Sequence, residues 1–507
     1  MAVAWIGRGI ALALGGLTSG ALPAAAQTQA ETASITPEAA RTPLTYAAAE
    51  ARLRSTSSLG RAADYGVDAA EAQAQVAAGL NRPTVSLDAQ LIRYRKTFDL
   101  SLGDTLDRAQ ADLGAAIPGL ISNLPGVPSD VLEQVGQRLE AALPEIFAAL
   151  PQDIRLQVDD TVFRPTVTAL QPIYTGGAIP ALRRAAAANV DLAQGRREEA
   201  MSLEGVNLAR TYFGQVLAAE ALKIARETRD GLDLHLHNAQ RLEEEGMLSH
   251  AQTLQVEVAR DAAQRQVNRA ELELENAVAS LARVAGVEAG VTPTTPLFVN
   301  RDPVGPADIF LHQAGEANSR IVQAQAGRDL AEAGADLAAS RLRPSVYAFG
   351  TYNLNPDNAL PTEPDWAFGL GARYTLMSSV DRRSMLGAAR AQASAAAQVE
   401  RQARDDARLL VTRAYNQAEL ARRQFLSMDS SLAAATENLR VQDIGFREGE
   451  ATAASVIDAR NLLGTARLQR AAAAYEYDLS LAALLAAAGS DLTLNDYLQR
   501  DDRISAP

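Results

Sequence analysis

The chain contains 507 residues, carries a formal net charge of −13 and has no cysteine. The lack of cysteine excludes disulfides, thiol catalysis and cysteine-ligated metals, and the negative charge argues against nucleic acid as a partner, because phosphate binding needs a basic surface. No Gly-rich phosphate loop, nucleophile elbow or paired catalytic motif occurs, so we expect no enzyme, no cofactor and no metal site.

Residues 1–26 resemble a signal peptide for export. Arg8 supplies a positive start, residues 10–22 supply an apolar core, and three alanines before Gln27 supply a small-residue cleavage site. The alternative, a membrane anchor, fits less well because the apolar run is short and rich in Gly and Ser. No later stretch approaches 18 consecutive apolar residues without charges, so we expect any membrane crossing to use strands.

A first structural repeat is predicted for residues 27–286. Its two strands are expected at about 83–97 and 158–174, with an external loop insertion at about 100–157 between them. A long helix at 176–245 and a returning helix at 249–284 follow. In the first strand Val85 and Leu87 alternate with polar residues, which indicates one apolar face. The long helix has no proline after its first turn and would extend roughly 105 Å if continuous.

Residues 287–315 hold four prolines and are predicted to be a linker between two halves. A second repeat follows at 316–489, and a C-terminal tail at 490–507. The two strands of the second repeat are expected at about 344–354 and about 365–377. Its long helix is expected at 378–448 and its returning helix at 452–487. Helical stretches at 43–80 and 316–342 have about half the length of the long helices. Stacked end to end with the returning helices, they would match the long ones.

The two repeats are similar in sequence. A shift of 203 residues places Ile173–Gly286 on Leu376–Gly489 without a gap, and Tyr212 then falls on Tyr415. Alanine matches alone would carry little weight in this composition, whereas matching tyrosines and glycines do. The shift therefore indicates an internal duplication, and long alanine-rich helices of this kind can pack at short interaxial distance.

Each long helix runs into a tight acidic turn. The turns read RLEEEGML around Gly246 and FREGEATA around Gly449, where glycine fits the left-handed residue that ends a helix. His235 and His237 precede the first turn and are two residues apart. On a helix they would point to different faces, so we expect solvated surface there rather than a metal site.

The segment WAFGLGARYTLM, residues 366–377, alternates strictly between apolar residues and small or polar ones. Its apolar face is predicted to contact lipid through Trp366, Phe368, Leu370 and Tyr374. Such alternation with clustered aromatic residues is typical of membrane β-barrels, although a water-soluble sandwich gives a similar pattern. Four strands cannot close a barrel and lipid does not tolerate an open sheet edge, so several chains would have to contribute.

These features together resemble the TolC-type outer-membrane efflux channels, from about Leu44 to Gly489. The resemblance rests on NRPTVSLDAQ, LQPIYTGG, FREGEATAASVIDAR and the duplication. It implies a mainly α fold with a small β part and duplicated helix-strand-strand-helix repeats. Four strands per chain would contribute to a trimeric, twelve-stranded membrane β-barrel, continued by a long periplasmic barrel of α-helices.

The resemblance also implies a function. Such a protein would be a passive outer-membrane exit duct of a tripartite efflux or type I secretion system, with its helical barrel in the periplasm. Its partners would be two further copies of itself, a periplasmic adaptor (membrane fusion) protein, a proton-driven or ATP-driven inner-membrane transporter, and outer-membrane lipid. The residues do not distinguish drugs, metals and proteins as cargo. The alternative is an exported, non-membrane coiled-coil scaffold that binds partner helices.

Particular residues follow from the resemblance. Family members can ring a closed periplasmic aperture with aspartates one helical turn apart; Asp458 matches the second position, and Ser455 occupies the first. Positions that latch neighbouring tips in the family fall on Gln252, Phe446 and Ala451, which lack the carboxylate, phenol hydroxyl and guanidinium expected there. Less cation binding and a weaker latch are therefore expected. Adaptor docking or tip turns are predicted for Gly246, Gly449, Leu248, Leu254, Phe446, Val456 and Ile457, with core packing as the alternative for the apolar ones.

Overall fold

A computed structural model describes residues 41–101, 153–358, 364–490 and 493–506, together with residues 112 and 116. The predicted signal peptide and most of the predicted external insertion lie outside these described residues. By their contacts, residues 42–507 form one unit and residues 1–41 another. The architecture below is that of the first of these units.

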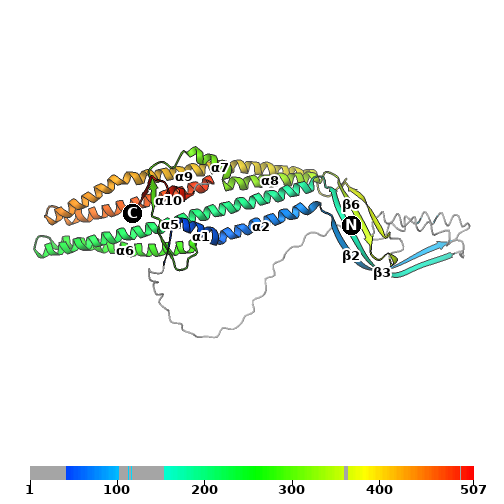
Figure 1. The fold of residues 1–507 in the computed structure, drawn as a ribbon, viewed down its shortest axis with the longest axis horizontal. Helices are drawn as coiled ribbons and strands as arrows, with labels where there is room; N and C mark the ends of the chain where they lie inside the picture. Colours follow the sequence, from blue (N-terminus) through cyan, green and yellow to red (C-terminus); the bar gives the residue numbers. More distant parts are fainter. Residues whose placement is uncertain are drawn as a thin grey trace, which may run out of the picture. The chain divides into compact units, whose positions relative to one another are not determined.

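Two long helices form the main axis of the helical part: α5 (Ala178–Glu244) and α9 (Arg382–Arg447). Each turns back into a helix of about half its length, α6 (His250–Ala285) after α5 and α10 (Ala453–Ala488) after α9. Shorter helices cover the remaining length (Figure 1), namely α1 (Tyr46–Thr56) and α2 (Ser58–Ala78) along α5, and α8 (Ser319–Ser340) between α5 and α9. Among the described helices, none is both long and apolar enough to cross a membrane.

Small residues let the long helices pack closely. At Gly195 of α5, an added Cβ would lie 2.8 Å from the side chain of Gln323 in α8. At Gly464 of α10, it would lie 3.1 Å from the hydroxyl of Thr228 in α5. Both contacts are at or below ordinary van der Waals separation, so these helix pairs approach as near as they do because no side chain intervenes.

Four antiparallel strands form one sheet in the order β2-β3-β6-β7. They are β2 (Thr84–Ser101), β3 (Asp153–Tyr174), β6 (Ser345–Asn353) and β7 (Trp366–Arg373). The predicted apolar face is exposed: Trp366 is 58%, Phe368 76% and Leu370 73% accessible. The two outer strands, β2 and β7, each have one edge without a partner among the described strands.

The last strand is shorter than predicted. It ends at Arg373, which pairs with Ser345, so Tyr374 lies beyond the strand, 56% exposed. The residue that would come next in the partner strand is Pro344, which has no backbone N–H to donate. Pairing therefore stops there, although the alternation in the sequence continues to Met377.

The segment predicted to be a linker is ordered and partly buried. Around the middle of the long helices, two small sheets pair β1 (Thr42–Leu44) with β4 (Val291–Pro293), and β5 (Phe298–Asn300) with β8 (Arg503–Ser505). The helices α7 (Ala307–Ala317) and α11 (Leu494–Leu498) complete this belt. Short apolar runs before and between the four prolines explain the difference, since Val291, Leu297, Phe298 and Val299 are fully buried.

The belt is attached through the duplicated tyrosines. The Tyr212 hydroxyl donates to the carbonyl oxygen of Leu44 at 2.7 Å and accepts N–H bonds from Thr294 and Thr295. The Tyr415 hydroxyl donates to the carbonyl oxygen of Gly305 at 3.0 Å. The two tyrosines, which are 203 residues apart in the sequence, thus both hydrogen-bond a chain segment that crosses the long helices.

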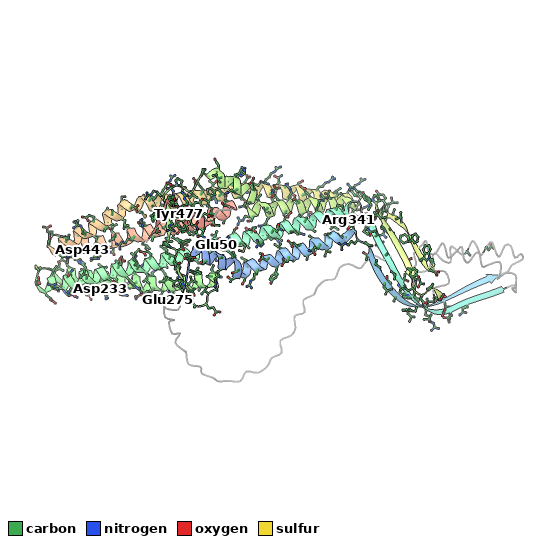
Figure 2. The ribbon with its side chains drawn as sticks, viewed as in Figure 1. Glu50, Asp233, Glu275, Arg341, Asp443 and Tyr477 are labelled. Carbon is green, nitrogen blue, oxygen red and sulfur yellow. The ribbon has the colours of Figure 1, made fainter. Side chains whose placement is uncertain are left out.

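Two buried acids lie in the belt and differ in their surroundings. Glu419 pairs with Arg422 at 2.8 Å and accepts the N–H of Val304. Burial opposes its ionisation, but these bonds outweigh burial and lower its pKa. Asp478, the residue after Tyr477 (labelled in Figure 2), is fully buried, and among the described residues its carboxylate accepts a hydrogen bond from the N–H of Phe298 alone, at 3.3 Å. Burial therefore raises the pKa of Asp478 well above its usual value.

Replacing Asp478 with asparagine should remove a pH dependence of stability. Because the folded-state pKa is raised, the unfolded chain loses its proton first as the pH rises. Stability then falls from about pH 4 upward, by about 1.4 kcal/mol per pH unit, until the folded carboxyl ionises. Melting temperatures at pH 5 and pH 8 should differ less in Asp478→Asn than in the wild type. Asp501→Asn, at an exposed position, is the control; equal slopes in all three proteins would contradict the assignment.

Candidate functional site at the helical turns

The two turns that join α5 to α6 and α9 to α10 have the same backbone structure. Gly246 and Gly449 have φ values of +75° and +78°, a left-handed conformation that favours glycine. The N–H groups of Met247 and Leu248 donate to the Leu242 carbonyl at 2.8 and 3.1 Å. Those of Glu450 and Ala451 donate to the Gly445 carbonyl at 2.7 and 3.1 Å. The duplication therefore extends to the hydrogen bonds of the tips.

Capping residues start the returning helices. Ser249 and Gln252 form a capping box at α6, with the Gln252 Oε1 atom 3.2 Å from the Ser249 backbone nitrogen. At α10 the Ser455 N–H donates to the Thr452 hydroxyl at 3.1 Å, and the Ser455 hydroxyl donates to the Thr452 carbonyl at 2.7 Å. Gln252 and Ser455, which the resemblance places at the latch and the aperture, are thus engaged in local capping. Their role in gating stays a prediction.

The apolar tip residues form a core between the two hairpins. Phe446 is 4% exposed and Val456 is fully buried, together with Val256, Ala239 and Ala453. Leu248 and Ile457 pack against this core and are partly buried. Of the apolar side chains predicted to dock an adaptor, Leu254 is the one that stands exposed, at 45%. For Phe446 and Val456 the alternative of core packing therefore describes the structure, because the hairpins bury these side chains against each other.

His235 joins the hairpins, contrary to its predicted place on the solvated surface. It is 3% exposed, its ring meets the Phe446 ring edge-on at 4.5 Å between centroids, and its Nε2 atom lies 3.3 Å from the Ala453 carbonyl oxygen. Burial lowers the pKa of His235. His237 is exposed, as expected. The two histidines point to different faces of α5, and the face of His235, which it shares with the buried Leu232 and Ala239, is the one that the other hairpin covers.

Arg460 makes a second connection between the hairpins. From α10 its Nη2 atom pairs with Asp443 of α9, in the same hairpin, at 3.0 Å, close to the tip in Figure 2. Its guanidinium also lies directly over Gly231 of α5, where any added Cβ would overlap it. Nearby, Arg467 of α10 pairs with Glu227 of α5 at 2.5 Å. The hairpins are therefore held together by charged contacts as well as by the apolar tip core.

Asp458 lies one position beyond Ile457, on the exposed face of α10. Within the described part of the chain no ion pair to it occurs, in contrast to Asp443, Asp233 and Glu243, whose carboxylates pair with Arg460, Arg260 and His250. Ser455 lies one turn before it and is partly buried. An exposed carboxylate without an intramolecular partner is available to other copies or to ions.

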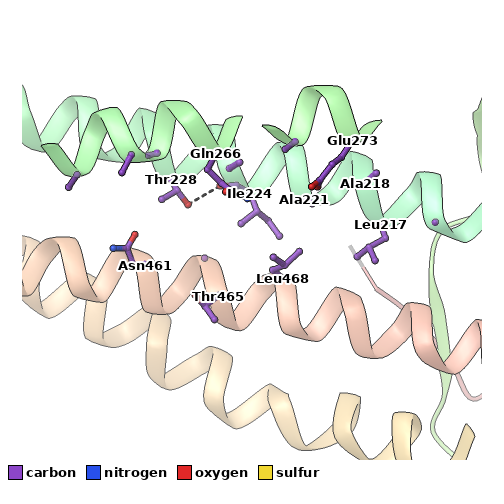
Figure 3. Close-up of a pocket in the computed structure, with 17 residues that line it drawn as sticks. Leu217, Ala218, Ala221, Ile224, Thr228, Gln266, Glu273, Asn461, Thr465 and Leu468 are labelled. Atoms are coloured by element: carbon purple, nitrogen blue, oxygen red, sulfur yellow. Dashed lines mark hydrogen bonds between the residues drawn. The ribbon is translucent and has the colours of Figure 1, made fainter. Parts of the chain in front are cut away.

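Between the tips and the belt, α5, α6 and α10 enclose a groove of about 550 Å³ (Figure 3). Its walls are mostly alanine and glycine, with Thr228, Gln266, Asn461 and Thr465 as polar groups. The Thr228 hydroxyl already donates to the Ile224 carbonyl at 2.9 Å. Small side chains explain the groove, which has no charged residue apart from Glu273.

The model of the outer membrane efflux protein family matches residues 156–287 and 310–490, which include both hairpins and three of the four strands. The chain belongs to this family. CyaE of Bordetella pertussis is 27% identical over 267 residues, which cover 50% of this chain and 56% of CyaE, so the match spans about half of each protein.

Solved structures with the same fold include outer-membrane channels. OprN superposes with a TM-score of 0.67 at 16% identity, over 88% of this chain and 90% of OprN. CmeC of Campylobacter jejuni superposes with a TM-score of 0.66 at 14% identity, over 90% of this chain and 88% of CmeC. These matches confirm the predicted family and the predicted fold class, mainly α with a small β part. The family match places the chain among the outer membrane efflux proteins.

Replacing Gly246 or Gly449 with alanine should destabilise the tips of this outer membrane efflux protein. A left-handed conformation costs an alanine about 1–2 kcal/mol. A Cβ added at either glycine would meet no atom within 4 Å, so the destabilisation comes from backbone strain and not from a steric clash. Hydrogen exchange of amides near each turn should speed up accordingly. The control is Gly387→Ala in the second turn of α9, also without neighbours, where alanine should stabilise the helix. Equal effects at the three positions would contradict this view of the turns.

Proposed function

We propose that this chain is a passive outer-membrane exit duct of a tripartite efflux or type I secretion system, built from three copies. The observation that supports it most is an open sheet with an exposed apolar face, carried by helices of about 100 Å. Lipid offers no hydrogen-bond partners to strand edges, so β2 and β7 need partners from other copies. Three copies of four strands give a closed ring of twelve.

The outer helices support side-by-side assembly. In the tip half, the main contacts between helices run from α6 to α5, from α5 to α10 and from α10 to α9, so that α6 and α9 lie at the two ends of this row. Both expose large apolar side chains along their length: Leu254, Val258 and Leu272 on α6, and Val399, Leu410, Leu420 and Val441 on α9. Exposed apolar surface of this kind favours burial against another copy. A ring of helices below the ring of strands would follow.

The proposed partners are a periplasmic adaptor and a proton-driven or ATP-driven inner-membrane transporter, which would meet the duct at the α5–α6 and α9–α10 turns. Family membership supports this arrangement, and the exposed turn residues Gly246, Gly449 and Leu254 would form part of the contact. The cargo is set by the transporter, so drugs, metals and proteins all stay open.

At the periplasmic end, three Asp458 carboxylates would approach the common axis. Like charges brought together disfavour one another's ionisation and favour a bound cation. The exposure of Asp458 and its lack of an ion pair among the described residues support this role. Ser455 at the neighbouring position adds no charge, so one carboxylate ring rather than two would control ion passage there.

Trp366 tests the membrane assignment directly. The chain has two tryptophans, and the other, Trp5, lies in the predicted signal peptide. In the exported protein Trp366 is therefore the expected source of tryptophan fluorescence. We expect strong quenching of this fluorescence by phospholipids brominated on their acyl chains, because Trp366 is 58% exposed on the apolar sheet face.

The matched control moves the tryptophan. The double variant Trp366→Phe, Tyr65→Trp places it on α2, at a side chain that is 71% exposed, and its emission should resist the same lipids. Quenching of neither protein, together with recovery in the soluble periplasmic fraction, would favour the non-membrane scaffold instead.

Asp458→Asn should weaken the block of the channel by divalent cations in planar lipid bilayers and raise its conductance. The reason is the loss of three converging charges. Glu288→Gln removes the same charge from an exposed position in the belt and should leave the block unchanged. Identical block in both variants and the wild type would remove Asp458 from the aperture while leaving the duct itself untouched.

A further inference from the structure

All four strands meet the long helices at the same end of the sheet, which we call the junction. The start of β2, the end of β3, the start of β6 and the end of β7 lie side by side there, next to the ends of α2, α5, α8 and α9 (Figure 1). The Arg343 Nη1 atom donates to the Gly176 carbonyl oxygen across the junction at 3.2 Å. At the opposite end, β2 and β3 stay paired to Ser101 and Asp153, beyond the bounds predicted for them from the sequence.

Positive charge is concentrated at the junction. The four stretches of sequence that join its strands to its helices contain nine arginines, one acid and no lysine. These stretches are residues 72–87, 165–190, 337–356 and 366–399. The chain as a whole carries a net charge of −13. The junction is therefore a basic zone in an acidic protein, and a basic zone attracts anions.

Several of these arginines have no acidic partner. Asp381, the acid of the junction, caps α9 by accepting the N–H groups of Arg383 and Ser384. The Arg382 Nη1 atom donates to the Arg341 carbonyl oxygen at 3.0 Å, and Arg341 is labelled at the junction in Figure 2. Within the described part of the chain, no ion pair includes Arg341, Arg382 or Arg383. Their guanidinium groups therefore have N–H groups left for an external anion.

An exposed apolar segment, residues 374–380, lies beside these arginines and connects β7 to α9. Four of its side chains are large, apolar and more than half exposed. They are Tyr374 at 56%, Leu376 at 86%, Met377 at 91% and Val380 at 54%. In the first repeat, the residues at the positions of Leu376 and Met377 still belong to a strand, since β3 continues to Tyr174. The exposed segment is thus a feature of the second repeat.

The surroundings of this segment point to lipid as its partner. It directly follows the apolar face of β7, on which Phe368 and Leu370 are 76% and 73% exposed, in a protein of an outer-membrane family. Tyrosine and basic residues are typical of the boundary between hydrocarbon and water. Exposed apolar side chains next to unpaired arginines match a membrane surface, because it offers acyl chains beside phosphate groups.

The backbone of the segment indicates how deep it lies. Pairing of β7 ends at Arg373. Among the described residues, the hydrogen bond that engages the backbone of the segment runs from the Val380 N–H to the Ser378 hydroxyl, at 3.2 Å. Hydrocarbon does not tolerate backbone groups without partners, whereas water and phosphate groups at the membrane surface satisfy them. The segment therefore fits the rim of the membrane and not its interior.

We propose that residues 374–380, together with Arg341, Arg382 and Arg383, form an anchor that binds anionic phospholipid at the rim of the membrane next to the helices. The apolar side chains contact the first part of the acyl chains, and the arginines bind the phosphate groups above them. This proposal rests on the proposed outer-membrane duct, because it requires lipid beside β7. It adds that the protein distinguishes lipids by the charge of their headgroups.

A tryptophan placed in the segment tests its depth. The variant Trp366→Phe, Met377→Trp moves the expected source of fluorescence from the strand into the segment. The matched variant Trp366→Phe, Phe368→Trp keeps it on the apolar face of β7. Both are reconstituted in phosphatidylcholine vesicles with bromines either near the start or near the end of the acyl chains. We expect the Met377→Trp variant to be quenched more strongly by the first position, and the Phe368→Trp variant by the second.

The arginines are tested in the Met377→Trp variant by changing which lipid is brominated. Vesicles contain phosphatidylglycerol and phosphatidylcholine at equal mole fractions, and one of the two carries bromines near the start of its acyl chains. We expect brominated phosphatidylglycerol to quench about twofold more strongly or better. Arg341→Gln combined with Arg383→Gln should abolish this preference. Arg373→Gln is the matched control and should keep it, because strand alternation places Arg373 on the face opposite the apolar one.

The outcomes separate the anchor from the duct. Quenching of the Phe368→Trp variant without quenching of the Met377→Trp variant overturns the anchor and leaves the duct standing, since protein would then cover the segment. Quenching of neither overturns both. Equal quenching by the two lipids, or a preference that Arg373→Gln also abolishes, overturns the recognition of anionic headgroups. A preference lost in the double arginine variant and kept in Arg373→Gln supports the proposal. All replaced side chains are exposed, so circular dichroism should show wild-type folding throughout.

Discussion

The open edges of a four-stranded sheet constrain everything else in this molecule. Antiparallel strands satisfy each other's backbone groups, but among the described strands β2 and β7 are left with one unpaired edge each. Water can satisfy such groups and hydrocarbon cannot. An exposed face of tryptophan, phenylalanine and leucine next to those edges therefore has a stable solution when equivalent strands from other copies complete the ring.

The helical part is very long and yet has no thick hydrophobic core. Helices of 67 and 66 residues are stabilised by packing rather than by their own propensity, and alanine and glycine keep that packing close. Two half-length helices placed end to end accompany each long helix, and the belt lies where they meet. The duplicated Tyr212 and Tyr415 anchor the crossing segments there. At the far end, His235, Phe446 and Arg460 hold the two hairpins together.

Much of this could be predicted from the sequence, because the signals are local or repeated. The 203-residue shift and the two turn glycines place the helix ends, since a left-handed residue is a strictly local requirement. The strand that ends at Arg373 was predicted too long because its limit depends on Pro344, a residue of the partner strand. Residues 287–315 were predicted to be a linker because they contain four prolines. The short apolar runs beside these prolines are what the belt buries.

The candidate site was harder to predict. Whether Phe446, Val456 and His235 are buried or exposed depends on how one hairpin packs against the other, and helical periodicity alone does not contain that information. Asp458 was predicted through resemblance; the structure shows that it is exposed, and its role at an aperture stays a prediction.

The most direct test of this account is an electron cryomicroscopy reconstruction of the protein in lipid nanodiscs. The account predicts a threefold axis, with β2 of each copy hydrogen-bonded to β7 of the next and Trp366 facing the lipid. A reconstruction in which single copies stand alone, or in which the sheet is folded away from the lipid against its own helices, would contradict it.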